Sequence, residues 1–145
     1  MRTFVYRARF ELGEKRSVIV VSFPDVPEAI TEGRGEADAM AQAQEALGLA
    51  LLTYPERDLP LPKPKAKGTD LVPIAVEAAI AAKLAFLNAF RDADISKSEF
   101  GRRIGKDEKE VRRLLDPKHP TKLSTLTQAL GILGQRLVVS VEDAA

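Results

Sequence analysis

The stretch SKSEFGRRIGKDEKEVRRLL at residues 96–115 decides how the second half of the chain folds. Two pairs of residues have the spacing of a capping box at the start of a helix, namely Ser96 with Glu99 and Asp107 with Glu110. Gly105 lies between the two boxes, and a glycine there can adopt the left-handed conformation that ends a helix. The stretch therefore predicts two short helices joined by a tight turn.

Both predicted helices are amphipathic. The apolar side chains expected to point inward are Phe100, Ile104, Val111 and Leu114, and the basic ones left outside are Arg102, Arg103, Lys109, Arg112 and Arg113. A module with one buried side and with arginines along its second helix has the format of a helix-turn-helix that enters a DNA major groove. The alternative is an ordinary helical hairpin with a solvated basic face. We favour DNA binding because the two boxes, the glycine and the arginines occur together.

The positions of polar and charged residues on and next to the two predicted helices indicate which of them would contact DNA. The candidate base-reading residues are Glu108, Lys109, Arg112 and Arg113, and the candidate phosphate contacts are Ser98, Lys106, Lys118 and Lys122. An arginine can bind guanine O6 and N7 through two hydrogen bonds, which gives about 1–3 kcal/mol of discrimination. Glu108 could accept from a cytosine N4, or its carboxylate could only compensate the dipole at the helix start.

The distribution of charge supports the same interpretation. The chain has 145 residues and a formal net charge of +1. Residues 96–136 hold ten basic and five acidic side chains, a net charge of +5, which leaves −4 for the rest of the chain. A concentration of basic charge is expected where a protein faces phosphates. The rest of the chain is acidic, and is therefore better suited to bind a partner other than nucleic acid.

Composition limits the class of protein. The chain is 45% hydrophobic and 30% charged, which indicates a soluble globular protein of one or two domains. It has no apolar run near the roughly eighteen residues of a transmembrane helix, and its N-terminus starts in an alternating pattern without a signal peptide. Cysteine is absent, which excludes disulfides and fits a reducing cytoplasm. We expect a cytoplasmic protein that does not enter a membrane.

The first half of the chain is expected to have the order β-β-β-α-β. Its elements follow from alternating apolar residues, β-branched runs and one stretch of helical spacing. The expected strands are residues 4–12, 17–23, 29–32 and 71–76, and the expected helix is residues 36–53. Gly33 closes the third strand, and Pro73 places the fourth at an edge or a bulge. Tyr6, Phe10 and Phe23 could line a ligand pocket, but their strand spacing favours the core.

A proline-rich connection follows the predicted helix. Residues 54–70 contain four prolines and the basic pentamer KPKAK at residues 63–67, which reads as an extended, partly mobile segment. A basic pentamer can indicate nucleic-acid binding, but a solvated linker is favoured here. We therefore divide the chain into a first domain at residues 1–76 and a helical second domain at residues 77–145.

The second domain begins and ends outside the quoted stretch. A helix is expected at residues 77–91, and a last helix rich in leucine ends at Gly134. His119 lies between prolines in a loop, where a surface histidine is the ordinary interpretation. The sequence RLVVSVE at residues 136–142 predicts a terminal strand, which could pair with the first domain or with its copy in a second subunit. We favour the second subunit.

Two segments together resemble a known family. VSFPDVPEAITEG at residues 21–33, followed by a helix, resembles the strand–FPDxPG–strand–helix signature of HicB proteins, the antitoxin halves of bacterial HicA–HicB toxin–antitoxin pairs. The matching positions are Phe23, Pro24, Asp25, Pro27 and Thr31. Glu28 stands where a glycine is frequent, and Ala29 takes the following small position. The helix-turn-helix is similar to the Cro/repressor type that many members append to this domain.

The resemblance implies an α+β protein with two tasks. Its N-terminal domain would be a partial ribonuclease H-like fold without nuclease activity that covers a HicA-type toxin, a small ribonuclease that cleaves mRNA with a histidine. Its C-terminal domain would repress the pair's own operon by binding operator double-stranded DNA as a homodimer or a higher even oligomer. No catalytic residue, metal site or cofactor is expected.

Two other functions are compatible with parts of the same sequence. Residual ribonuclease H chemistry would need carboxylates that converge on Mg²⁺; Glu11, Asp25 and Glu28 are available, but surface acids are usually only solvated. The nearer alternative is a stand-alone helix-turn-helix transcriptional regulator whose first domain binds a ligand or dimerises.

Overall fold

The computed structural model describes residues 1–144. The chain divides into two compact units, Met1–Ala81 and Ala82–Ala145. The first contains a sheet with a helix and the second is helical, so the expected α+β class is confirmed. No helix in the described part of the chain is long and apolar enough to cross a membrane.

A four-stranded antiparallel sheet forms the centre of the first unit. Its strands are β1 (Val5–Leu12), β2 (Val18–Ser22), β3 (Ile30–Arg34) and β4 (Val72–Ala75), in the spatial order β3-β2-β1-β4. Phe10 lies opposite Val21 on β2, and Tyr6 lies opposite Ile74 on β4. Pro73 is on an edge strand, as expected, because a proline cannot donate to a second neighbour. The predicted β-β-β-α-β order is confirmed, while the ribonuclease H-like classification stays a prediction.

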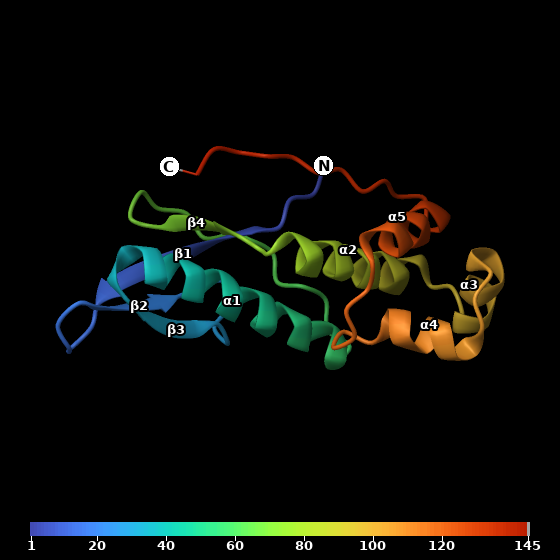
Figure 1. Ribbon diagram of the computed structural model, residues 1–145, viewed down its shortest axis with the longest axis horizontal. Coiled ribbons are helices and arrows are strands. Elements are labelled where there is room, and N and C mark those ends of the chain that lie inside the picture. The colour runs from blue at the N-terminus through green and yellow to red at the C-terminus, as the bar shows by residue number, and fades with distance from the viewer. Residues whose placement is uncertain (145) are drawn as a thin grey trace. The chain divides into compact units, whose positions relative to one another are not determined.

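One helix, α1 (Gly35–Glu56), lies across the sheet (Figure 1). Its buried side is made of small and apolar residues at four-residue spacing, namely Ala39, Ala43, Leu47 and Leu51. The helix also contacts β3 closely, because a Cβ built on Gly33 would lie 2.5 Å from the Ala39 backbone nitrogen. Gly33 therefore lies within β3 rather than closing it. This glycine lets helix and strand approach to a distance that a side chain would prevent.

The proline-rich segment starts later than expected and is hydrogen-bonded to other residues of the first unit. The helix continues through Pro55 to Glu56, so the connection does not begin at residue 54. Tyr6 donates its hydroxyl hydrogen to the Pro62 carbonyl oxygen at 2.6 Å. The Asp25 carboxylate accepts hydrogen bonds from the backbone nitrogens of Lys65 and Ala66 at 2.9 and 2.8 Å. The lysines of KPKAK are exposed, in agreement with a solvated segment.

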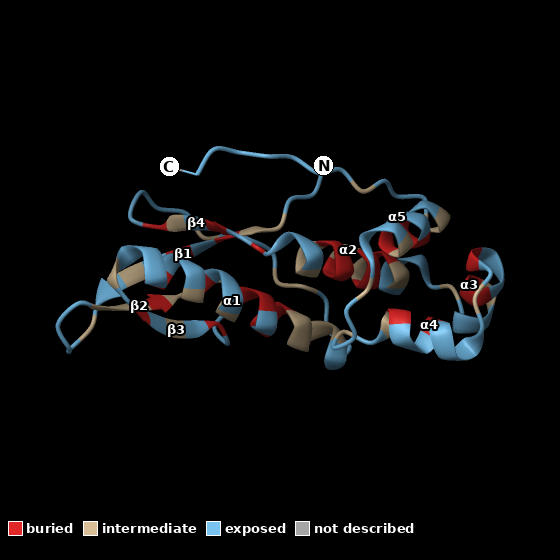
Figure 2. Ribbon diagram, in the orientation of Figure 1, coloured by how far each residue is buried: buried red, intermediate tan, exposed pale blue. Residues whose placement is uncertain are grey.

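Four helices make up the rest of the chain. They are α2 (Ala78–Ala93), α3 (Lys97–Ile104), α4 (Glu108–Leu115) and α5 (Leu123–Ile132), and each carries buried residues on one side (Figure 2). The rings of Phe86, Phe90 and Phe100 contact one another, with centroids 5.4–6.3 Å apart. Ile104, Val111 and Leu114 complete the side that was expected to point inward, and all are buried. The predicted inner face of residues 96–115 is confirmed.

The expected terminal strand is wrong for the chain as it stands. Residues 136–142 form neither strand nor helix. Val138, Val139 and Val141 are 54%, 70% and 94% exposed. Alternating side chains make a strand only when a neighbouring strand supplies hydrogen bonds, and the described residues of the second unit contain no strand.

Candidate nucleic-acid interface

Short local hydrogen bonds determine where α3 and α4 begin. The Ser96 hydroxyl accepts from the backbone nitrogen of Glu99 at 3.0 Å, and the Asp107 carboxylate accepts from that of Glu110 at 2.8 Å. Each bond satisfies a backbone N–H that has no partner within the first turn of its helix. Gly105 ends α3 in the left-handed conformation, with φ of +72°. Both predicted N-caps and the predicted glycine turn are confirmed.

The glutamate half of each predicted capping box is wrong. The Glu99 carboxylate pairs with the guanidinium groups of Arg102 and Arg103, rather than returning to the start of α3. Glu110 pairs with Lys106, with 3.4 Å between Nζ and the carboxylate oxygen. Cations one turn away compete for these carboxylates, and hydrogen bonding to Arg103 holds the pKa of Glu99 below its ordinary value.

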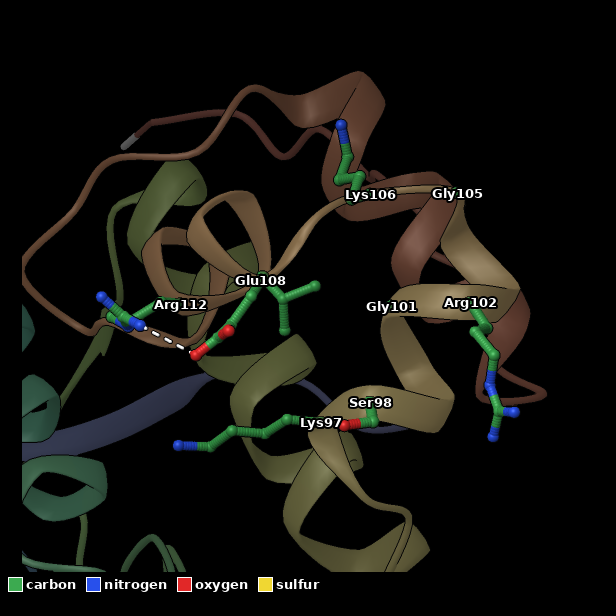
Figure 3. A pocket seen from close by; sticks show the side chains of 9 residues that line it. Lys97, Ser98, Gly101, Arg102, Gly105, Lys106, Glu108 and Arg112 are labelled. Carbon is green, nitrogen blue, oxygen red and sulfur yellow. Dashed lines mark hydrogen bonds and ion pairs between the residues drawn. The ribbon is translucent and has the colours of Figure 1, made fainter.

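A groove with a volume of about 660 Å³ runs between α3 and α4 (Figure 3). Four of the predicted contacts line it: Ser98, Lys106, Glu108 and Arg112. Arg112 donates to the Glu108 carboxylate at 3.0 Å, and both side chains are largely exposed. An ion pair this exposed contributes little to stability, so a phosphate or a base edge can replace Glu108 at low cost. Glu108 thus has a third role that neither sequence interpretation included.

The other predicted contacts are exposed but do not line this groove. They are Lys109, Arg113, Lys118 and Lys122. Within residues 1–144, none of their side chains forms an ion pair. Lys109 and Arg113 are one turn apart on α4, whereas Lys118 and Lys122 lie between α4 and α5. The structure therefore presents two groups of cations, one in the groove and one beyond it.

Two further groove residues were not nominated from the sequence. Lys97 and Arg102 line the groove beside Ser98 and Gly101. Lys97 is the first residue of α3 and immediately precedes Ser98, so its position next to a predicted contact could have identified it from the sequence. Arg102 was expected to face outward and is exposed, although it was not assigned a contact.

A buried lysine supports the end of α4, and it was not among the residues predicted from the sequence. Lys83 on α2 is only 4% exposed. Its ammonium group donates to the carbonyl oxygen of Leu114 at 2.6 Å and to the Thr121 hydroxyl at 2.7 Å. Burial lowers its pKa to about 8, and the negative charge of Asp116 opposes that shift. The only sequence signal is a lysine within an otherwise apolar run at residues 78–87.

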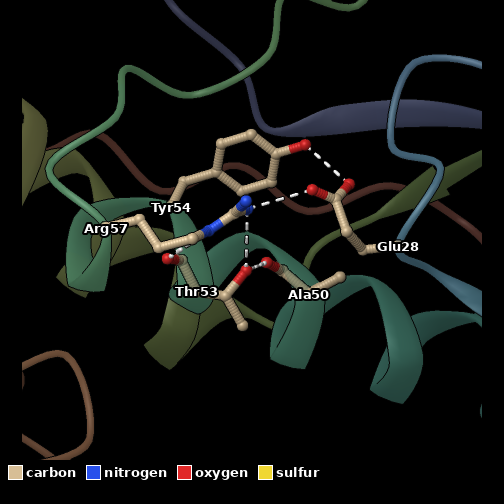
Figure 4. Close-up of polar contacts among 5 residues, drawn as sticks. All are labelled: Glu28, Ala50, Thr53, Tyr54 and Arg57. Atoms are coloured by element: carbon tan, nitrogen blue, oxygen red, sulfur yellow. Dashed lines mark hydrogen bonds and ion pairs between the residues drawn. The ribbon is translucent and has the colours of Figure 1, made fainter.

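In the first unit, polar contacts join the motif segment to α1 (Figure 4). Glu28 accepts hydrogen bonds from the Tyr54 hydroxyl at 2.7 Å and from Arg57 at 3.0 Å. The Arg57 guanidinium lies 4.8 Å from the centroid of the Tyr54 ring. The hydrogen bond from Tyr54 is the main cause of a lowered pKa at Glu28, and burial is the main cause of a raised pKa at Tyr54. Glu28 therefore joins the turn before β3 to the end of α1.

The carboxylates considered for nuclease chemistry have other partners. Asp25 and Glu28 form the bonds described above, and Glu11 lies 3.9 Å from Arg9. Among residues 1–144, no group of three or more histidine, cysteine, aspartate or glutamate side chains could hold a metal ion. His119 is exposed in the loop after α4.

Comparison with known proteins identifies relatives that match most of the chain. A family model described as "HicB_like antitoxin of bacterial toxin-antitoxin system" matches residues 5–85. The chain is 38% identical to "Antitoxin HicB" of Escherichia coli strain K12 over 118 residues, which are 81% of this chain and 86% of the relative.

Two relatives from Photorhabdus laumondii subsp. laumondii extend the comparison. "Antitoxin HicB 1" is 36% identical over 84% of this chain and 77% of its own length, and "Antitoxin HicB 2" is 37% identical over 91% and 92%. The alignment to "Antitoxin HicB 2" spans 132 residues, so the similarity continues beyond the first unit at Met1–Ala81.

Proposed function

The chain belongs to the HicB-like antitoxin family, and from this premise we propose that it neutralises a HicA-type, mRNA-cleaving toxin and represses its own operon. The first unit contains most of the matched residues and is assigned the toxin. The second unit is assigned operator DNA, which it binds as a helix-turn-helix made of α3 and α4.

One observation carries the DNA assignment. On α4, Val111 and Leu114 are buried while Lys109, Arg112 and Arg113 are exposed. The helix is thus held by one side and offers cations on the other, which is what a helix needs in order to enter a major groove. The N-cap at Asp107 and the turn at Gly105 hold its first turn at a defined angle to α3.

The positions of the groove residues suggest which of them bind phosphates and which bind base edges. Ser98, Lys97 and Lys106 lie at or near the start of the two helices, where hydroxyl, ammonium and backbone N–H groups suit phosphate oxygens. Arg112 and Arg113 are placed for base edges. When Arg112 turns toward a guanine, it leaves Glu108 free to accept from a cytosine N4 or to remain solvated.

A homodimer is the expected binding form. One module of this size contacts few bases, so two-fold related modules that read half-sites about 34–36 Å apart give the required specificity. If each module neutralises about three phosphates, the logarithm of the affinity should fall with the logarithm of salt concentration with a slope near −5.

The toxin assignment rests on the family and on charge. The chain outside residues 96–136 has a net charge of −4, which favours rapid encounter with a basic ribonuclease. The partner is expected to be encoded beside this chain, as a short basic protein with one catalytic histidine.

Co-expression tests both assignments. The neighbouring short reading frame should arrest growth alone and permit growth together with this chain, and the two products should purify as a complex. Fluorescence anisotropy with the duplex upstream of the operon should show salt-dependent binding that a scrambled duplex lacks. Binding to DNA without any effect on the neighbouring product would instead support the stand-alone regulator.

A further inference from the structure

The ammonium group of Lys83 connects three parts of the second unit. It comes from α2 and reaches the last turn of α4, where it lies 2.6 Å from the Leu114 carbonyl oxygen and 3.4 Å from that of Arg113. It also donates to the hydroxyl of Thr121, in the loop before α5, at 2.7 Å. These acceptors match the three donors of a charged lysine.

The location is favourable for a cation and unfavourable for a neutral side chain. The last carbonyl groups of a helix lack partners within it and carry partial negative charge. Lys83 supplies hydrogen bonds to two of them, and no described buried side-chain nitrogen or oxygen lacks a partner. Without the ammonium group, the Leu114 carbonyl oxygen would lose this hydrogen bond in a buried location, and an unsatisfied buried acceptor costs about 1–3 kcal/mol.

The groups that Lys83 holds lie next to the proposed DNA contacts. Arg113 and Leu114 are the residues whose carbonyl oxygens it binds, and Arg113 is a candidate base reader. Thr121 immediately precedes Lys122, and the loop from α4 to Thr121 also contains Lys118, both candidate phosphate contacts. A displacement of this ammonium group would therefore release both ends of the segment that contains Lys118 and is flanked by Arg113 and Lys122.

We infer that Lys83 is a positioning residue for DNA binding, which holds the end of α4 and the loop at residues 116–122 in the conformation that meets the phosphate backbone. This inference rests on the proposed function, because it concerns the same interface. Lys83 itself does not touch DNA, since its side chain is almost completely buried. Its depressed pKa agrees with an ammonium group enclosed by protein.

Single-site chemistry can test the role of the charge. The native chain has no cysteine, so Lys83→Cys introduces a unique thiol. Alkylation of the unfolded full-length variant with 2-bromoethylamine, followed by refolding, rebuilds an ammonium group at the length of lysine. Alkylation with 1-bromopropane gives a neutral side chain of nearly the same shape, and is the matched control.

Operator affinity and its salt dependence are the measured quantities. The aminoethyl form should bind within about threefold of the native protein, while the propyl form should bind at least about tenfold more weakly. The slope against salt should become shallower by about one for each phosphate contact that is lost. A protein that is only partly unfolded would lose active fraction and keep the slope of the native protein.

The outcomes separate the inference from the proposed function. Equal affinity and slope in the two alkylated forms would overturn the positioning role while leaving operator binding intact, as would weaker binding with an unchanged slope. Failure of the native protein to bind the operator would overturn the DNA assignment itself. Thr121→Val provides a second variant if the alkylated forms refold poorly. It removes one acceptor of Lys83, and should weaken operator binding and make the salt slope shallower.

Discussion

Glu28 and Arg57 are 29 positions apart in the sequence, and their side chains form an ion pair of 3.0 Å. The pair joins the turn before β3 to the residue that ends α1, and the Tyr54 hydroxyl adds a hydrogen bond to the same carboxylate. Glu28 therefore connects this turn to the C-terminal end of α1 through two side-chain contacts.

We expect Glu28→Gln to lower the free energy of unfolding by at most about 1 kcal/mol, because the pair is partly exposed and screened by solvent. Urea denaturation of the variant, of Arg57→Met and of the double variant would give the coupling energy between the two groups. Glu45→Gln, at an exposed position on α1, is the matched control. A coupling energy of zero would show that the contact contributes nothing.

The Arg112→Ala, Arg113→Ala double variant should lose operator binding and retain toxin inhibition, because both side chains are exposed and neither contributes to the core. Lys63→Ala with Lys65→Ala is the matched control, since it removes the same charge from the solvated proline-rich segment. Anisotropy at constant salt would measure both variants. Retained operator affinity in the arginine variant would reject α4 as the reading helix.

Gly33→Ala should destabilise the first unit by about 1–3 kcal/mol, because the added Cβ would lie 2.5 Å from the Ala39 backbone nitrogen. Gly131→Ala on α5 meets no atom within 4 Å and should instead stabilise its helix, by up to about 1 kcal/mol. Thermal denaturation of both variants would distinguish close helix–strand packing from a general intolerance of glycine replacement. Similar melting temperatures for the two would contradict the packing argument.

We expect the ionisation of Tyr6 to lower the stability of the folded protein in alkaline solution. Burial is the largest cause that raises its pKa from 10.0 to about 12, with a smaller contribution from the charge of Asp25. The folded protein therefore keeps this proton where the unfolded chain releases it. The resulting stability is fully present below pH 10 and is lost as the pH rises toward 12.

Tyr6→Phe should reduce that alkaline loss, because phenylalanine has no proton to release. Urea denaturation of both proteins at pH 9 and near pH 11.5 would measure it, and the other alkaline titrations, including that of Lys83, are common to the two proteins. An equal loss in the variant would show that Tyr6 does not titrate differently in the folded protein. The hydrogen bond to the Pro62 carbonyl oxygen is also lost at every pH, which lowers stability by about 1 kcal/mol.

The local features near α3 and α4 were predictable because each depends on residues close in sequence. Ser96 and Asp107 cap backbone groups three residues away, and Gly105 acts through its own backbone conformation. The glutamate contacts were missed for a related reason. Capping competes with nearby arginines and lysines, and spacing alone does not say which of them the carboxylate binds.

Residues 136–142 show where a local pattern fails to predict the structure. This segment has the β-branched composition of a strand and apolar side chains at positions 137, 139 and 141, yet it forms no strand within the described chain. Periodicity describes which side chains could share a face, but a strand also needs a neighbour to satisfy its backbone.

The sequence by itself determined the four strands of the sheet, the helices, their order and the side of α3 and α4 that is buried, because side-chain periodicity, caps and turns act over a few residues. The tertiary structure alone decided that Lys83 lies beneath the end of α4, that Glu28 meets Arg57, and that Asp25 fastens the proline-rich segment. These contacts join residues 29 to 41 positions apart. Their formation depends on how packed elements bring distant groups together, which no local pattern in the chain encodes.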